Sequence, residues 1–347
     1  MGRLHAAVAD LPPGAFAFVM ATGIVSIGLD QQGLPTVSTA LLVVAIIAWT
    51  LLVLALVGRL VAYRDRALAD LHDPRRAFGY FTLIAGSGVI AVRMLEEAWA
   101  VSAVLLALAA IVGLVLGYAV PWAAVLSREE RPVLTEANGT WFIWVVASQS
   151  VSTTAAGLEP LVGTGRAELA VLAVCAWSVG VVLYAACAVF VALRLVLYPL
   201  TPHDLNPPYW VSMGAVAITI VAGAKITEMT TTPIVAATGG LIAGLVVLCW
   251  AWATWLIPVL VAVGLWRHAV HRIPLRYEST WWSIVFPLGM YAVAGMYLGR
   301  ADSLPIVERI GAVWLWVALA AWLLAAAAMV HGWSRGTVIG VGSTVRR

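Results

Sequence analysis

The sequence is poor in charge and in cysteine, and each shortage excludes a class of protein. Only 11% of the 347 residues are charged and 63% are hydrophobic, whereas soluble domains average about 25% and about 45–50%. The three cysteines, Cys175, Cys187 and Cys249, lie in separate apolar positions and form neither a disulfide framework nor a metal motif. The net charge of +3 comes without a basic run, so no nucleic acid partner is predicted. The composition is typical of an integral membrane protein.

Ten stretches free of Asp, Glu, Lys and Arg are long enough, or nearly long enough, to cross a bilayer core, which takes about 20 apolar residues. They are residues 11–29, 31–58, 77–92, 98–127, 137–158, 169–193, 205–224, 229–266, 279–299 and 310–334. The third is the shortest, and its Arg93 is expected to reach toward the interface. The sequence therefore predicts an all-α membrane protein with ten transmembrane helices and one domain, residues 1–347.

An aromatic cluster opens every second stretch. The clusters begin at Gly14, Ala77, Gly139, Pro208 and Thr280, at intervals of 63, 62, 69 and 72 residues. Regular spacing of this kind indicates one repeated supersecondary unit, which here is a membrane hairpin of two helices. The predicted hairpins are residues 11–66, 75–128, 137–198, 205–268 and 279–334. Five hairpins around one axis leave a central pore, so transport is the leading hypothesis.

The basic residues predict the orientation of the helices. Fifteen of the 20 fall on one side of the predicted membrane segments. Because cytoplasmic loops carry the excess of Arg and Lys, both termini are expected in the cytoplasm of a multi-pass protein of the cell membrane.

The odd-numbered stretches differ from the even-numbered ones in length and in glycine. They have 16–22 residues rather than 25–38, and 13 glycines in 98 residues rather than 11 in 146. Small residues let membrane helices approach closely, and longer apolar helices can tilt against lipid. We expect the odd-numbered helices to form an inner ring and the others to surround it.

The odd-numbered stretches also carry most of the hydroxyl groups within the predicted membrane segments. A weakly polar pore lining is one interpretation; the alternative is that these groups bond to their own helix or to a neighbour. Two pairs, Thr22 with Ser26 and Ser148 with Ser152, are spaced i,i+4, so the members of each pair share a helix face. The candidate lining residues are Thr22, Ser26, Thr82, Ser87, Ser148, Ser152, Thr219 and Ser283.

Charge is absent from the middle of every odd-numbered stretch. Arg93 and Lys225, the single lysine of the chain, lie near the outer ends of two of them. They are candidates for an outer electrostatic vestibule, or else residues that extend to water at the interface. A pore without fixed charge at its centre selects by dipoles and width and discriminates weakly among small anions.

The segment TWWSIVFPLG at Thr280 contains a proline inside a predicted helix. Pro287 lacks a backbone donor, frees the carbonyl of Ser283 and disturbs the helix at Phe286. A kink beside a bulky aromatic residue can place a ring across a narrow axis, where it would gate by occlusion or dewetting. Phe286 and Pro287 are therefore the candidate gate.

Four segments resemble one known family. They are PPGAFAFVMATGIVSIG at Pro12, NGTWFIWVVASQSV at Asn138, DLNPPYWVSMGAVAIT at Asp204 and TWWSIVFPLG at Thr280. The chain is similar through them to the tellurite-resistance/dicarboxylate transporter family, which includes plant slow anion channels, fungal malate permeases and sulfite efflux pumps. The similarity extends from about residue 10 to residue 332.

The resemblance implies ten helices in five hairpins with quasi-fivefold symmetry, a central pore and a homotrimer whose protomers conduct separately. It implies that Phe286 plugs the pore. It also implies small anions as substrates, among them nitrate, chloride, malate, sulfite and tellurite-related species, with MATGIVS closest to the malate and sulfite branch.

Three alternatives to a passive anion channel stay open. A proton-coupled C4-dicarboxylate carrier is disfavoured because no carboxylate or histidine is predicted mid-membrane; His331 falls near the end of the last helix. A membrane enzyme would need a metal or acid/base cluster, and the pair His268 and His271 has no carboxylate before Glu278. A non-transporting sensor or assembly subunit is the third. No cofactor and no metal are predicted.

Overall fold

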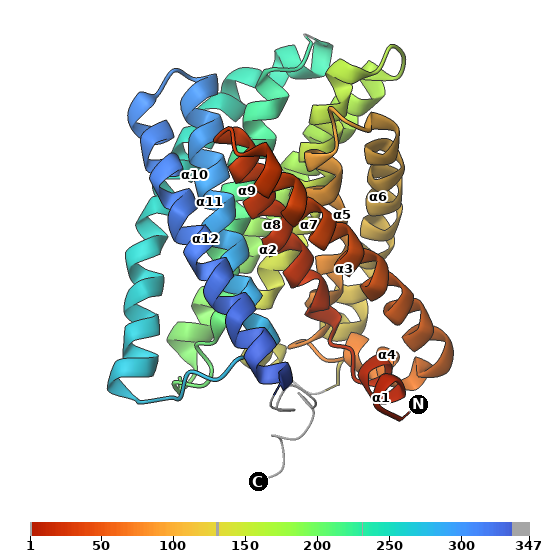
Figure 1. The fold of residues 1–347 in the computed structure, drawn as a ribbon, viewed down its shortest axis with the longest axis vertical. Coiled ribbons are helices and arrows are strands. Elements are labelled where there is room, and N and C mark those ends of the chain that lie inside the picture. Colours follow the sequence, from red (N-terminus) through yellow and green to blue (C-terminus); the bar gives the residue numbers. More distant parts are fainter. Residues whose placement is uncertain (1, 130–131, 231, 335–347) are drawn as a thin grey trace.

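The computed structural model describes residues 2–129, 132–230 and 232–334, and this part of the chain contains helices and no strand. A helix occupies each of the ten predicted stretches (Figure 1). These helices are α2 (Ala17–Gln31), α3 (Pro35–Ala62), α5 (Phe81–Arg93), α6 (Trp99–Pro121), α7 (Phe142–Leu158), α8 (Arg166–Leu197), α9 (Val211–Thr227), α10 (Pro233–Leu265), α11 (Trp282–Ala301) and α12 (Pro305–Ser334).

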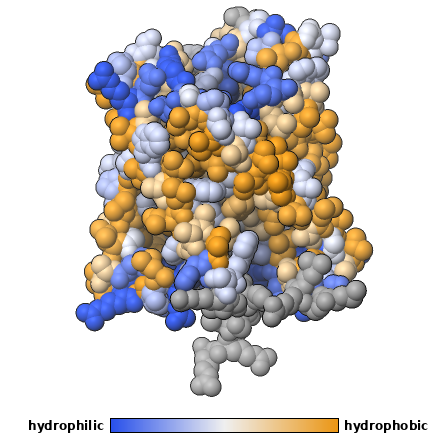
Figure 2. Space-filling model, in the orientation of Figure 1, coloured by the Kyte–Doolittle hydropathy of each residue, from blue (hydrophilic) through white to orange (hydrophobic). Residues whose placement is uncertain are grey.

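Eight of these helices, taken with the short 3₁₀ or π turns at their ends, are long and apolar enough to cross a bilayer. The apolar helix Ala77–Arg93 is shorter, and α7, which contains Ser148, Gln149 and Ser150, is not among the eight. An apolar band lies between two polar edges on the face shown in Figure 2. The chain is therefore a multi-pass membrane protein.

Two further helices were not predicted, because a search for long charge-free stretches does not detect short helices that contain charged residues. They are α1 (Gly2–Ala9) and α4 (Arg64–Leu71), each of eight residues. Arg59 of α3 connects them: its Nη2 donates to Asp70 Oδ2 at 2.7 Å and its Nε to the Ala9 carbonyl at 3.2 Å. Both charged groups are buried, so the pair fixes α1 and α4 to one end of α3.

Helices α2, α5, α7, α9 and α11 form a closed ring, which we call the inner ring. Each contacts the next, and α11 contacts α2. The other long helices lie outside; α3 packs on α2 and α5, α6 on α5 and α7, α8 on α7 and α9, α10 on α9 and α11, and α12 on α11 and α2. In the most apolar window of each span, 78% of residues are buried for α2 but 17% for α3. This arrangement agrees with the expectation from helix length.

Glycine occurs in every contact between neighbouring inner helices or their first turns. At Gly23, Gly88, Gly139, Gly214 and Gly289 an added Cβ would lie 2.3–3.0 Å from an atom of the adjacent inner-ring segment. Their nearest neighbours are, in the same order, Val89, Ser150, Pro208, Pro287 and Ile24. The glycine excess of the odd-numbered stretches thus reflects close helix approach, which in a membrane gains mainly van der Waals contact.

Each inner helix is preceded by one turn of 3₁₀ helix. The turns are Pro13–Phe16, Ala77–Tyr80, Gly139–Trp141, Pro207–Trp210 and Ser279–Trp281, and they contain the repeated aromatic clusters. Rings join adjacent turns and helices: Phe78 stacks on Trp141 at 5.0 Å, and Phe18 meets Trp282 edge-on at 4.8 Å. The aromatic repeat therefore aligns the starts of the five inner helices.

Candidate functional site

Two cavities lie at opposite ends of the inner ring. The one bordered by the starts of the inner helices, which we call the N-terminal cavity, has a volume of about 700 Å³. The one bordered by their last turns, the C-terminal cavity, has a volume of about 260 Å³. All five inner helices or their first turns contribute to both cavities, so both lie on the axis of the ring.

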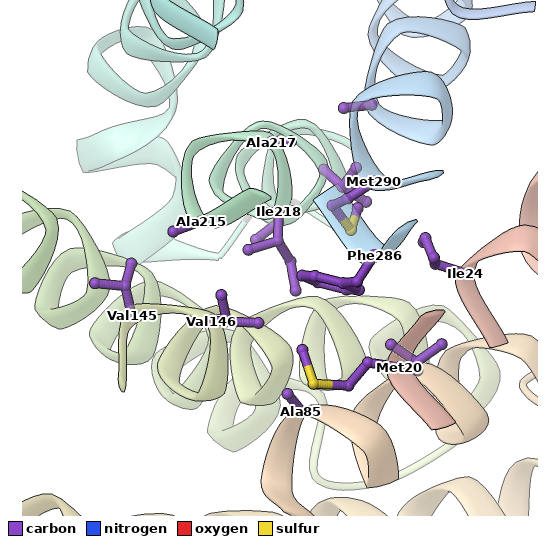
Figure 3. Close-up of a cluster of buried hydrophobic side chains, with 14 of the residues drawn as sticks. Met20, Ile24, Ala85, Val145, Val146, Ala215, Ala217, Ile218, Phe286 and Met290 are labelled. Atoms are coloured by element: carbon purple, nitrogen blue, oxygen red, sulfur yellow. The ribbon is translucent and has the colours of Figure 1, made fainter. Parts of the chain in front are cut away.

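Buried apolar side chains from all five inner helices separate the cavities. Phe286 extends between Ile218 and Met20 in Figure 3 and is 1% exposed. Met20 and Phe286 border the N-terminal cavity, whereas Ile24, Ile218 and Met290 border the C-terminal one. We call this group the apolar layer: Met20, Ile24, Ala85, Val146, Ile218, Phe286 and Met290.

Pro287 follows Phe286 inside α11, which continues through it to Ala301. Its ring packs on α9, because a Cβ added at Gly214 would lie 3.0 Å from Pro287 Cγ. Two residues further, Gly289 lets α11 approach Ile24 of α2. Contacts with both neighbours of α11 therefore fix the backbone that carries the Phe286 ring.

The N-terminal cavity is bordered by a residue from each of the five 3₁₀ turns: Gly14, Gly79, Thr140, Pro208 and Thr280. Helix N-termini carry free backbone N–H groups and the positive end of the helix dipole, which favours anions. Charged side chains at the same cavity are three arginines and two carboxylates: Arg75, Arg76, Arg128, Asp73 and Glu136. Both contributions make this cavity attractive to anions.

The C-terminal cavity is bordered by the last turns of the inner helices, where the dipole is negative. Three of those turns contain a basic residue, namely Arg93, Lys225 and Arg300. Cations at helix C-termini offset the dipole, but the carboxylates of Asp30, Glu96 and Glu97 border the same cavity, so this end is less attractive to anions than the N-terminal cavity.

The two basic residues predicted for the outer vestibule, Arg93 and Lys225, both border the C-terminal cavity. They differ in their side-chain partners. Arg93 is buried and donates to Asp30 at 2.9 Å, to Glu97 at 2.5 Å and to Ser38 at 3.0 Å. Lys225 Nζ lies 4.8 Å from the centroid of the Tyr297 ring. It has no ion pair or hydrogen bond within the described ranges, and Glu228 and Glu96 are the carboxylates that act on it electrostatically.

Of the eight hydroxyl residues predicted as pore lining, Thr82 and Ser283 border the N-terminal cavity. Thr82 Oγ1 donates to the Gly79 carbonyl at 2.7 Å. The other six border neither cavity. They are Thr22, Ser26, Ser87, Ser148, Ser152 and Thr219.

These six hydroxyls bond to outer helices or within their own helix. Ser148 and Ser152 share one face, as their spacing predicts, but donate to the Ala176 and Ala173 carbonyls of α8. The remaining partners are Trp322 for Thr22, Ser38 for Ser26, Trp49 and Leu83 for Ser87, and Ala215 for Thr219. A hydroxyl between two helices satisfies its donor there, which is the alternative that the sequence left open.

The sequence analysis missed several residues that border the cavities. Ser150 and Thr153 of α7 border the C-terminal cavity. Thr140 borders the N-terminal cavity, and its buried hydroxyl has no hydrogen-bond partner within the part of the chain described. Thr140 lies in the quoted motif NGTWFIW, in the 3₁₀ turn before α7. The aromatic cluster that marks this turn is the sequence signal that could have located it.

The two histidines of the HAVHR loop have separate partners. His268 Nδ1 lies 2.8 Å from the Ile273 carbonyl oxygen, whereas the His271 ring packs against Trp266. Residues 2–129, 132–230 and 232–334 contain no group of three or more His, Cys, Asp or Glu side chains placed to hold a metal ion.

Comparison with known proteins identifies the family of this fold. A family model described as voltage-dependent anion channel matches residues 10–330. The chain belongs to the voltage-dependent anion channel family. This agrees with the resemblance seen in the four sequence segments.

The relatives of this chain include a membrane protein and two transporters. The chain is 58% identical over 149 residues to an uncharacterised membrane protein of Mycobacterium tuberculosis, covering 43% of this chain and 76% of that protein. It is 24% identical over 327 residues to an uncharacterised transporter of Methanocaldococcus jannaschii, covering 91% and 92%. A second transporter of that organism is 23% identical over 198 residues, covering 57% and 56%. Family and relatives point to membrane anion transport rather than to an enzyme.

Proposed function

We propose that this protein conducts small anions passively along the axis of the inner ring, with Phe286 as the gate. The observation that carries the proposal is the axial order of N-terminal cavity, apolar layer and C-terminal cavity. A layer of buried apolar side chains between two cavities is the arrangement of a pore closed by occlusion. Displacing one ring, Phe286, would connect the cavities.

Selection for anions follows from the direction of the five inner helices. Their N-termini surround the N-terminal cavity and supply positive potential without a fixed charge in the apolar layer. Thr82 and Ser283 add hydroxyl dipoles at that cavity. Arg93 and Lys225 act at the opposite mouth, where Lys225 is the more available to an anion because Arg93 is held in two ion pairs.

The finer architecture belongs to the same proposal. Ten transmembrane helices form five hairpins with quasi-fivefold symmetry, and residues 1–347 are one transmembrane domain. The repeated pairing of each outer helix with two inner ones supports this symmetry. The N-terminal cavity faces the cytoplasm, where both termini lie, in the cell membrane. The assembly is a homotrimer of separately conducting protomers.

The substrates are small anions, including dicarboxylates such as malate, sulfite and inorganic anions. A pore that selects by dipoles and width accepts several of them. Passive conduction is favoured over proton coupling because residues 20–24 and 286–290, which lie between the two cavities, include no acidic residue and no histidine. Buried acidic or histidine residues are the usual proton relays of coupled carriers.

The test is an anion-replacement series on purified protein in planar bilayers of zwitterionic lipid. Reversal potentials that follow the anion gradient, and ignore the cation gradient, are expected for every small anion tried. Imposing a pH gradient should leave these potentials unchanged. Currents that follow the cation gradient would refute anion conduction, and a shift that follows the proton gradient would establish a coupled carrier instead.

A further inference from the structure

The segment Asp73–Arg76 places two arginines at the N-terminal cavity, in different electrostatic states. Arg75 Nε is paired with Glu136 Oε2, and Glu136 borders the same cavity. Arg76 Nη1 lies 2.8 Å from Asp70 Oδ1, which belongs to α4 and does not border the cavity. The counterion of Arg75 therefore lies at the cavity, whereas the counterion of Arg76 lies outside it.

The counterion of Arg76 is shared with a second arginine. Asp70 Oδ2 accepts from Arg59 Nη2 at 2.7 Å, and Arg59 is 2% exposed. A buried guanidinium requires its carboxylate partner, and Arg59 Nη1 is already buried without a hydrogen bond within the described residues. One negative charge thus serves two positive ones, and the excess positive charge resides on Arg76, whose side chain is 44% exposed.

Arg76 also keeps part of its hydrogen-bonding capacity free. Asp70 occupies Nη1, whereas Nε and Nη2 have no polar partner in the part of the chain that the structure describes. The backbone that carries the side chain is fixed, because Trp141 Nε1 donates to the Pro74 carbonyl at 3.0 Å and Arg76 N donates to the Asp73 carbonyl at 3.0 Å. A planar guanidinium with one free edge is suited to two parallel hydrogen bonds to an oxyanion.

We propose that Arg76 binds one planar oxyanion, of the carboxylate class, in the N-terminal cavity. The inference rests on the proposed anion conduction and names the chemistry that the cavity prefers. Through its fork Arg76 favours a carboxylate over a spherical halide of equal charge. Arg75 does not contribute, because Glu136 pairs with it, borders the same cavity and neutralises its charge there. Asp70 is the positioning residue that holds the fork toward the cavity.

The experiment compares acetate with chloride, two monovalent anions, applied from the side of the N-terminal cavity to reconstituted protein. The substitution Arg76→Lys keeps the charge and removes the fork. It should raise the half-saturating concentration of acetate about tenfold or more, as expected for the loss of one charge-assisted hydrogen bond, and change that of chloride less than twofold. Arg76→Gln should raise both concentrations.

The matched controls are Arg75→Lys and Arg75→Gln, in the same segment and at the same cavity. Both should leave the ratio of the acetate and chloride concentrations at the wild-type value. An unchanged ratio in Arg76→Lys, or an equal change in Arg75→Lys, would overturn the assignment.

A second measurement does not depend on conduction. Phenylglyoxal modifies accessible arginines, and mass spectrometry of the purified protein reports each site. Acetate should slow the modification of Arg76 at least threefold and leave that of Arg75 unchanged, although Arg75 is the more exposed at 61% against 44%. Equal rates with and without acetate would reject the site. Protection without any current in bilayers would retain the site and reject the proposed conduction.

Discussion

Gly139 and Pro208 bring the first turns of α7 and α9 into backbone contact. A Cβ added at Gly139 would lie 2.3 Å from the carbonyl carbon of Pro208. Real Cβ atoms do not approach backbone so closely, and backbone cannot rotate aside as a side chain can. The inner ring therefore closes at this point only because residue 139 has no side chain.

Replacing this glycine tests the closure of the ring. Gly139→Ala should destabilise the protein by about 1–3 kcal/mol through overpacking, seen as a lower unfolding temperature in detergent. Gly14→Ala is the matched control, since it borders the same cavity in an equivalent turn and its added Cβ meets nothing within 4 Å. Equal stability of the two variants would contradict the close approach.

Removing the ring of Phe286 tests the gate. Phe286→Ala should increase anion conductance several-fold, because the ring is the largest side chain of the apolar layer and its loss connects the two cavities. Bilayer recordings at fixed anion concentration measure the change. Phe142→Ala serves as control, since Phe142 is equally buried on an inner helix but faces Tyr184 of α8. Unchanged conductance in Phe286→Ala would remove the gate role and leave the fold intact.

The positions of the hydroxyls predict a separation of stability from conduction. Ser152→Ala removes the bond to Ala173 of α8 and should cost about 0.6 kcal/mol, with no change in anion currents. Ser283→Ala removes a hydroxyl at the N-terminal cavity and should lower anion current while the unfolding temperature stays constant. The reverse pattern would show that Ser152 lies in the conduction path.

Lys225 should act on anions at the C-terminal cavity. Because its ammonium rests on the Tyr297 ring, Lys225→Gln should raise the half-saturating anion concentration on that side about threefold by weakening electrostatic attraction. Arg166→Gln removes the same charge at the same end, but Arg166 pairs with Glu159 and does not border the cavity. An identical effect of the two substitutions would show that Lys225 acts only through the net charge of this end of the protein and not through its position at the cavity.

Much of the fold could be predicted because membrane helices have strict requirements of length and apolarity. The ten charge-free stretches each became a helix, and the glycine excess located the inner ring. The short helices α1 and α4 were not predicted, because the buried pair of Arg59 and Asp70 that fixes them joins residues distant in the sequence. No local sequence pattern indicates such a pair. The candidate site was less predictable. The neighbouring Pro287 drew attention to Phe286, which lies in the apolar layer. The i,i+4 spacing of Ser148 and Ser152 is compatible both with a pore lining and with a contact between helices, so it could not distinguish the two.

The sequence by itself determined that the chain lies in a membrane, that its aromatic and glycine repeat alternates between two kinds of helix, and that the centre carries no charge. Only the tertiary structure decided which side of each inner helix faces the axis. Hydrophobicity alone cannot identify that side, because the side of an inner helix that packs on its neighbours and the side that faces a closed pore are both apolar. The packing decided it: Ser152 lies against α8, Ile218 lies in the apolar layer, and Arg76 shares its counterion Asp70 with the buried Arg59.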